Sequence, residues 1–281
     1  MPELRYIFPH DDGENDRLDQ FHYMIYKVLL RKPHQGRLPS RGACAVLDVG
    51  YGTGYWLADM GALYPHAELF GIDLAPLVRD QMATGRDTHH LNWDYEQPQW
   101  PLAEGSLDLI HMSGLCGSVA NWDHLYLKPG TGRLEIIEID WQPRCDDGTL
   151  PLGPNDAFTV WWDTMRSASA RLGKPIQYPH HLPQALEQIG FEVEKNDTIR
   201  IQSWEYGDDE YDELTAEAAR WYVCAMGKTP NDDNRPLRSF SGMSMELFTR
   251  VEGWTADQVE RLQEALYDPV ERSSVHLYHR L

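Results

Sequence analysis

Val46-Leu-Asp-Val-Gly-Tyr-Gly-Thr-Gly54 is the stretch from which the fold can be read. An apolar run ends there in three glycines at alternate positions, and a helical pattern opens directly behind them. This order predicts a buried strand that turns tightly into a helix N-terminus, where glycine permits positive φ and lets a ligand approach the backbone. The spacing differs from the dinucleotide fingerprint G-x-G-x-x-G, so a glycine turn kept for packing remains the alternative.

A second apolar run, Glu68-Leu-Phe-Gly-Ile-Asp73, ends in a carboxylate. Asp73 follows the glycines by roughly 20 residues, the distance at which α/β nucleotide folds place the acid that accepts the ribose hydroxyls. Asp73 could also cap the helix expected from Pro76, and the two roles can coexist. The glycine loop and Asp73 together favour a cofactor that contains a nucleoside.

From residue 44 onward, strand and helix patterns alternate, as a doubly wound sheet requires. Five strands are expected near residues 45–49, 68–73, 89–93, 107–112 and 133–139, followed by a polar loop over residues 141–151. Ligands bind at the carboxyl ends of such strands. The side chains and loops that this rule brings together are residues 50–54, Asp73, Asp94, Tyr95 and residues 111–113.

A helix is expected before the first strand, capped by Asn15 or Asp16 and running to about Leu30. Its position lets it lie over the cofactor, and residues 31–41 then read as a solvated basic linker. We therefore divide the chain into a helical lid and linker over residues 1–43 and a main domain over residues 44–281. Helical insertions are expected at about residues 150–175 and 205–270. The sequence predicts little helix between the fourth and fifth strands. A sixth strand region is expected over residues 191–204 and the beginning of a last strand over residues 274–281, but not the complete terminal strand hairpin that such folds usually have.

Composition narrows the class of protein. The formal charge of −19 argues against a broad nucleic-acid footprint, because phosphates would be repelled. We find no apolar run of the ~20 residues that span a bilayer and no secretory signal, so a secreted protein is not expected. The four cysteines form no C-x-x-C pair, which favours free structural thiols and no metal site. Ten tryptophans and fourteen tyrosines suit either a walled ligand pocket or ordinary core packing.

The glycine loop, Asp73 and Asp94 after the third strand resemble the corresponding motifs of class I S-adenosylmethionine-dependent methyltransferases. More narrowly, the chain resembles the fungal LaeA-type group, methyltransferases that regulate secondary metabolism. The segments that carry this resemblance are Glu14-Asn-Asp-Arg-Leu18, Asp108-Leu-Ile-His111, Cys116-Gly-Ser-Val119, Leu127-Lys-Pro-Gly-Thr-Gly132 and Glu138-Ile-Asp-Trp-Gln-Pro-Arg-Cys-Asp-Asp-Gly-Thr-Leu-Pro151. The resemblance implies a Rossmann-like fold, S-adenosylmethionine as cofactor, velvet-domain proteins as partners and a nuclear location, with a cytoplasmic one as the alternative.

The resemblance also implies which residues meet the cofactor. Asp73 would accept the ribose hydroxyls and Asp94 the adenine amino group, although Asp94 could instead cap a turn. Tyr51 stands where a small residue is usual, and its phenol could stack on the sulfonium, form a hydrogen bond or crowd the site. The expected cofactor contacts are Asp48, Gly50, Tyr51, Gly52, Gly54, Asp73, Leu74, Asp94, Tyr95 and His111.

Methyl transfer from a sulfonium is an in-line displacement, so alignment supplies most of the help that a protein can give. If the acceptor must lose a proton, His111 is the best-placed base and His124 a second candidate. His111 could equally be a core histidine or contact the cofactor. Glu138 and Asp140 could orient an acceptor or brace the Arg144 loop. The acceptor pocket is expected to be lined by Tyr23, Trp141, Trp161 and Trp162.

Two functions remain open at this point. The first is a LaeA-type regulator that works with partner proteins, and the second is a small-molecule O- or N-methyltransferase of a biosynthetic pathway. An acceptor pocket walled by tryptophans would favour the small-molecule enzyme. The same tryptophans exposed as a patch would favour an interaction surface.

Overall fold

A computed structural model describes residues 7–9, 11–38, 44–75, 88–125, 132–204, 213–226, 239–272 and 274–281. Its central feature is a parallel five-stranded sheet with the order β3-β2-β1-β4-β5. The order reverses between β1 and β4, and α/β sheets bind their ligands beside such a point. The predicted doubly wound, Rossmann-like fold is confirmed. The strands are β1 (Ala45–Val49), β2 (Glu68–Asp73), β3 (Thr88–Asn92), β4 (Leu109–Ser113) and β5 (Arg133–Ile137).

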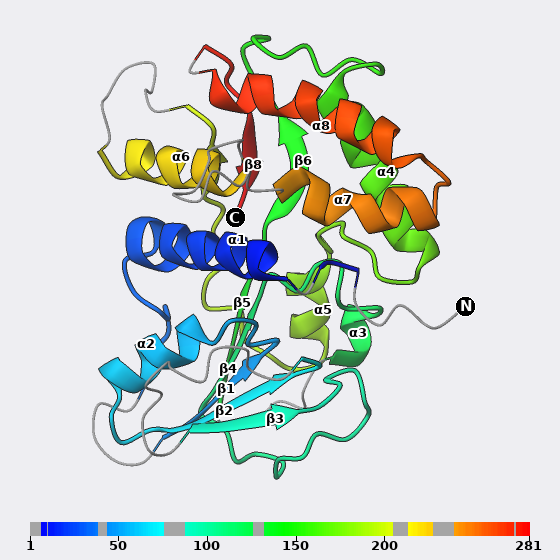
Figure 1. Cartoon of the computed structure of the whole chain (residues 1–281). Coiled ribbons are helices and arrows are strands. Elements are labelled where there is room, and N and C mark those ends of the chain that lie inside the picture. The colour runs from blue at the N-terminus through cyan, green and yellow to red at the C-terminus, as the bar shows by residue number, and fades with distance from the viewer. Residues whose placement is uncertain are drawn as a thin grey trace.

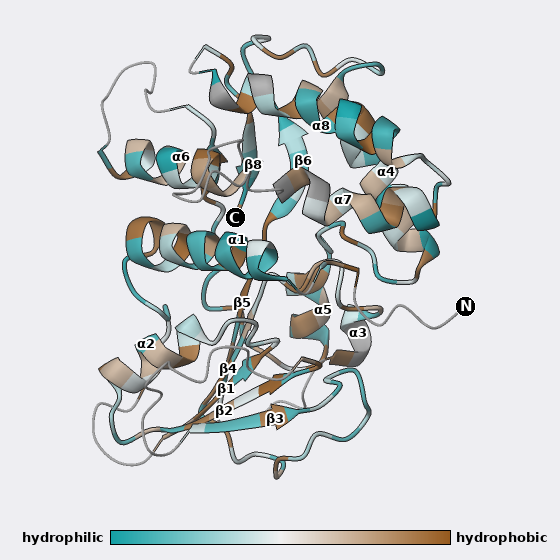
Figure 2. Cartoon of the chain, in the orientation of Figure 1, coloured by the Kyte–Doolittle hydropathy of each residue, from teal (hydrophilic) through white to brown (hydrophobic). Residues whose placement is uncertain are grey.

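Helices cover both faces of this sheet, which explains the almost continuous apolar sequence of β1. Figure 1 shows α2 (Tyr55–Leu63) on one side, and α3 (Trp122–Leu125) with α5 (Leu182–Gln188) on the other. In Figure 2, β3 at the sheet edge is hydrophilic, whereas β1 and β4 are largely hydrophobic. The connection from β4 to β5 contains only the one-turn helix α3 in its described part, as the sequence predicts.

A second, antiparallel sheet has the order β6-β8-β7. Its strands are β6 (Asp140–Arg144), β7 (Arg200–Gln202) and β8 (Tyr278–Arg280). The prediction of a polar loop from residue 141 is therefore wrong for its first part. β7 and β8 lie within the two strand regions that the sequence predicts, and their antiparallel pairing corrects the expectation of an incomplete terminal hairpin. Strands of three residues carry almost no periodic pattern, so their bounds cannot be read from the sequence.

Four longer helices gather around this second sheet (Figure 1). They fall where the sequence predicts helical insertions, at about residues 150–175 and 205–270. They are α4 (Ala157–Arg171), α6 (Glu213–Met226), α7 (Ser239–Arg250) and α8 (Ala256–Glu271).

The N-terminal helix lies between the two halves of the molecule (Figure 1). It comprises α1 (Asp12–His22) and a continuing π-helical segment, η1 (Tyr23–Leu29). Asp11 caps α1 by accepting a hydrogen bond from the Glu14 amide at 2.9 Å, so the helix starts earlier than the predicted caps Asn15 and Asp16. α1 contacts α2, α6 and α7, which is the placement expected of a lid.

Across the ranges that the structure describes, we find no helix both long enough and apolar enough to cross a membrane.

The capping box of α8 gives a test of the fold. Thr255 Oγ1 accepts a hydrogen bond from the Gln258 amide at 3.3 Å, and Gln258 Oε1 accepts one from the Thr255 amide at 2.8 Å. We expect Thr255→Ala to lower the free energy of unfolding by about 1 kcal/mol and the Tm by a few degrees, measured by circular dichroism. Thr255→Ser keeps the hydroxyl, so an equal loss in that variant would contradict the capping explanation.

Candidate functional site

The glycine loop after β1 has the positive-φ backbone that its sequence predicts. Gly50, Gly52 and Gly54 have φ values of 70°, 51° and 83°, in the left-handed region that favours glycine. A Cβ atom at Gly50 would also lie 2.6 Å from the side chain of Leu115. Substitution of these glycines would therefore change both the turn and the space above it.

Asp73 ties the end of β2 to the glycine loop. Its Oδ2 accepts a hydrogen bond from the Gly52 amide and its Oδ1 one from the Ala75 amide, both at 2.9 Å. Asp73 also lines the cavity described below, at the end of β2 where α/β folds place the acid that meets a ribose. Asp73 thus fixes the loop and stands at the expected ribose position.

Tyr51 is turned against β2. Its hydroxyl donates to the Ala75 carbonyl at 3.0 Å. Gly71 makes room for the ring, because a Cβ at that position would lie 2.6 Å from Tyr51 Cδ1. Of the roles considered for Tyr51, the structure shows the hydrogen bond, which supports the segment after β2.

A cavity of about 860 Å³ lies between this loop and the helix formed by α1 and η1. Such a volume is typical of sites for sizeable small molecules. Most of the residues predicted for the cofactor line it. They are Asp48, Gly50, Tyr51, Gly52, Asp73, Leu74, Tyr95 and His111, and Trp141 joins them from the predicted acceptor pocket.

Several predicted site residues lie elsewhere. Asp94 faces its own turn, where Oδ1 accepts a hydrogen bond from the Glu96 amide at 3.0 Å, so the turn-cap alternative describes it. Gly54 caps α2 behind the cavity wall. The side chain of His124 falls outside the described part of the chain.

Three of the four residues predicted for the acceptor pocket also need correction. Tyr23 is 40% exposed and packs against Trp221, with ring centroids 4.3 Å apart. Trp161 is buried among the helices of the second half and donates a hydrogen bond to Ser244 Oγ at 2.8 Å. Trp162 is buried in the same core. Ordinary core packing therefore accounts for both tryptophans. The prediction failed because helical spacing in the sequence does not show which side chains a buried tryptophan will contact.

Three buried polar side chains are hydrogen-bonded in a row from the sheet, which forms the floor of the cavity, to η1, which forms its roof. His111 Nδ1 lies 2.8 Å from Asp48 Oδ1, and His111 Nε2 lies 2.8 Å from the hydroxyl of Tyr26. Trp56 stacks on the imidazole at 3.9 Å with the rings almost parallel. The register of β1 and β4 sets Asp48 beside His111. Tyr26 was not singled out from the sequence as a site residue.

The π-helical turn explains why Tyr26 was missed. Its wider spacing is seen in the hydrogen bond from the Leu30 amide to the Ile25 carbonyl, at 2.8 Å, and such turns often mark functional sites.

Burial raises the pKa of Tyr26 well above its usual value. The charges of Asp48, Glu135 and Glu138 raise this pKa further, whereas a hydrogen bond from Ser113 lowers it. Tyr26 therefore stays protonated, and its hydroxyl shares a hydrogen bond with His111 Nε2.

Glu138 braces the turn that follows β4. Its two carboxylate oxygens accept hydrogen bonds from the amides of Leu115 (2.6 Å) and Cys116 (3.1 Å). Glu138 also lines the cavity, and burial raises its pKa to about 7. The Arg144 loop is braced by Asp140 instead, which pairs with Arg144 Nη2 at 2.5 Å.

A buried ion pair on α1 forms another part of the cavity wall. Arg17 Nε donates to Glu14 Oε2 at 2.8 Å, and Arg17 Nη2 lies 2.5 Å from Glu14 Oε1. The i,i+3 spacing in Glu14-Asn-Asp-Arg17 is the sequence signal that could have identified this pair as a unit.

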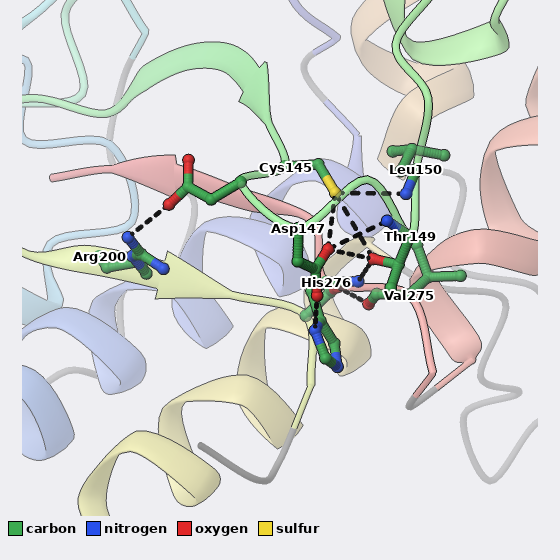
Figure 3. A network of polar contacts seen from close by, with 9 residues as sticks. Cys145, Asp147, Thr149, Leu150, Arg200, Val275 and His276 are labelled. Carbon is green, nitrogen blue, oxygen red and sulfur yellow. Dashed lines mark hydrogen bonds and ion pairs between the residues drawn. The ribbon is translucent and has the colours of Figure 1, made fainter. Parts of the chain in front are cut away.

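The segment after β6 performs a structural task away from the cavity (Figure 3). Thr149 Oγ1 donates to Asp147 Oδ1 at 2.8 Å and accepts from the His276 amide at 2.9 Å, while Asp147 also pairs with the His276 ring. Asp146 binds both Arg200 and Tyr278, at 2.9 and 2.8 Å. These contacts attach the loop to the C-terminal strands. In the described residues no cluster of His, Cys, Asp or Glu has the geometry of a metal site.

The cavity suits a nucleoside-containing cofactor such as S-adenosylmethionine. The backbone at Gly50 and Gly52 presents no Cβ to a ligand, and the Asp73 carboxylate stands where a ribose would lie. Tyr95 and Leu74 provide apolar surface next to that position. The opposite wall is formed by residues of α1 and η1.

Glu138 gives a pH-dependent prediction. Because its folded pKa of about 7 is raised above the ordinary 4.5, folding favours the protonated form. Its stabilising contribution is full below about pH 4.5 and is lost as the pH rises through 7, by up to ~3 kcal/mol. Glu138→Gln cannot titrate, so its free energy of unfolding relative to wild type should rise over this window, measured by urea unfolding at pH 5 to 8. The exposed Glu192→Gln is the control, and a pH-independent difference for Glu138→Gln would contradict the prediction.

Comparison with known proteins identifies the family. Residues 21–196 match the family described as "Methyltransferase domain". The chain is 33% identical to "Secondary metabolism regulator LAE1" of Cochliobolus heterostrophus, over 98% of this chain and 87% of that protein. It is 32% identical to "Secondary metabolism regulator laeA" of Monascus pilosus (98% and 72%) and 30% identical to "Protein-methionine methyltransferase laeA" of Emericella nidulans (98% and 70%). The chain therefore belongs to the methyltransferase-domain family and, within it, to the LaeA-type S-adenosylmethionine-dependent methyltransferases.

Proposed function

We propose that this protein regulates secondary metabolism by transferring a methyl group from S-adenosylmethionine to an acceptor held beneath α1. The observation that carries the proposal is the single cavity in which the glycine loop and Asp73 face a second wall formed by α1 and η1. Similarity to regulators of secondary metabolism, at 32–33% identity over 98% of the chain, supports the biological role. The small-molecule alternative relied on a pocket of three tryptophans, of which Trp141 alone lines the cavity.

The cofactor, when bound, supplies an electrophilic methyl group on a sulfonium. Gly50 and Gly52 would hold its methionine part and Asp73 its ribose, while Tyr95 would lie beside the adenine. The chain contributes alignment and exclusion of water, which supply most of the rate in such a displacement.

The acceptor half of the cavity is largely apolar. Phe21 and Trp141 meet edge to face with centroids 5.6 Å apart, and Ile139 and Met243 complete this wall. Because the space is enclosed by α1, we propose that the acceptor is one side chain of a protein or a small molecule of similar width. A broad surface could not reach the methyl group.

Partner and location follow from the LaeA-type resemblance as further proposals. We propose velvet-domain proteins as partners and the nucleus as the place of action. The chain's net charge of −19 suits a partner with a basic face, since opposite charges steer association.

Cofactor binding tests the site directly. Asp73→Asn removes the charge that would accept the ribose hydroxyls, and we expect the affinity for S-adenosylmethionine to fall about 10- to 100-fold by calorimetry. Asp94→Asn is the matched control, since Asp94 caps a turn, and its affinity should stay near that of wild type. No binding heat from the folded wild type, or equal losses in both variants, would overturn this assignment of the site.

Complementation tests the biological role. Expressed in an Emericella nidulans strain that lacks its own laeA, the wild-type chain should restore the profile of secondary metabolites, and Asp73→Asn should not. Both proteins must accumulate equally, as judged by immunoblot. Tagged wild type should also copurify a velvet-domain protein. Restoration by Asp73→Asn would show that methyl transfer is not required, and recovery of the chain alone would contradict the partner proposal.

A further inference from the structure

We propose that the buried ion pair of α1, Glu14 and Arg17, binds the zwitterionic amino-acid end of S-adenosylmethionine. Arg17 meets the carboxylate of that end and Glu14 its ammonium group. The inference rests on the proposed function and adds two specificity-determining residues to its cofactor site. The pair selects ligands that carry the amino-acid end over nucleosides that lack it.

The charges of the cavity wall are the first argument. Arg17 is the one lysine or arginine among the described residues that line the cavity. The carboxylates of the same wall are Asp11, Asp12, Glu14, Asp48, Asp73 and Glu138. A guanidinium is always charged, and its planar fork matches a carboxylate. A ligand that brings a carboxylate into this cavity therefore has Arg17 as its permanently cationic partner.

The position of Arg17 is the second argument. The next residue, Leu18, lies over the glycine loop, because its Cδ1 would be 3.9 Å from a Cβ on Gly52. On the other side, Arg17 Cζ lies 5.4 Å from the ring centroid of Phe21, which belongs to the acceptor wall. Arg17 thus lies between the loop expected to hold the methionine part and the wall that the methyl group would face.

The burial of the pair is the third argument. The side chains of Arg17 and Glu14 are only 6% and 4% exposed. Burial of two charges costs desolvation free energy, and apolar residues in their place are often equally or more stabilising. Both residues belong to α1, so the bond between them does not attach this helix to another element. Stability alone is a weak reason for such a pair in a cavity wall, whereas recognition of a charged ligand requires one.

The pairing also explains why the ligand should be a zwitterion. Glu14 already neutralises Arg17, through contacts of 2.8 Å at Nε and 2.5 Å at Nη2. A lone carboxylate would compete with Glu14 for the guanidinium. An α-amino acid brings an ammonium group beside its carboxylate, so each charge meets an opposite one and the net charge of the cavity does not change.

The consequence for methyl transfer is alignment. A short aliphatic chain joins the amino-acid end of the cofactor to its sulfonium. Contacts at Glu14 and Arg17 would therefore restrict where the sulfonium lies relative to Phe21 and Trp141. Such restriction supplies much of the rate in a displacement between two bound groups.

The test compares two matched pairs of ligands by calorimetry on the full chain. S-adenosylmethionine and decarboxylated S-adenosylmethionine are both sulfonium ions and differ in the carboxylate. S-adenosylhomocysteine and 5′-methylthioadenosine are both thioethers and differ in the amino-acid end. In each pair, the wild type should prefer the ligand with the complete amino-acid end by about tenfold or more.

Two variants connect these preferences to the ion pair. Arg17→Gln should reduce the preference for S-adenosylmethionine over its decarboxylated form to near unity. Glu14→Gln combined with Arg17→Gln leaves no unpaired buried charge, and it should reduce both preferences. The control is Arg166→Gln, which breaks an i,i+3 ion pair with Asp163 on α4, outside the cavity, and should leave both preferences unchanged.

A competing explanation is that the ion pair only stabilises α1. The Arg17 variants would then weaken all four ligands alike, and unchanged preferences would overturn the proposal. Equal affinity of the wild type for S-adenosylmethionine and its decarboxylated form would overturn it without any variant. Failure of the folded wild type to bind any of the four ligands would instead overturn the cofactor site of the proposed function.

Discussion

Between β1 and β4, the two largely hydrophobic strands at the centre of the sheet, the carboxylate of Asp48 and the imidazole of His111 form a hydrogen bond. Buried polar groups are costly unless their bonding capacity is met. Asp48 satisfies one ring nitrogen, and the other would be left without a partner if the cavity had no roof. Tyr26 meets that need from η1. The position of the N-terminal helix thus depends on a polar pair in the sheet core.

The second sheet fixes the far wall of the same cavity. Trp141 on β6 packs edge to face against Phe21 of the roof and against His279 of β8. Burial lowers the pKa of His279 to about 4, so the ring is neutral near pH 7 and hydrogen-bonds to Tyr222 at 2.9 Å. A cavity wall is in this way held by the last residues of the chain and by α6.

The sequence predicts well those features that depend on residues close together in the chain. The glycine loop and Asp73 follow from backbone sterics and spacing within one strand–turn–strand unit, so they could be named from the residues alone. The pairing of β6 and β7 with β8 joins residues some 76 to 140 positions apart, and no local pattern in the sequence indicates it. The same holds for Trp161, whose partner Ser244 lies 83 residues away, and for Tyr26, which a π-helical turn sets against His111.

The LaeA-type segments divide by the task that the structure gives them. Glu14 and Arg17 line the cavity from α1, and His111 lines it from β4. In the longest segment, Glu138 and Trp141 face the cavity, whereas Asp146, Asp147 and Thr149 attach the following loop to β7 and to the segment before β8 (Figure 3). The segment of residues 138–151 therefore has two physical roles: its first part lines the cavity, and its second part attaches the loop to the second sheet. Because β8 holds β6 and β6 carries Trp141, the structural role also sets the shape of the acceptor wall.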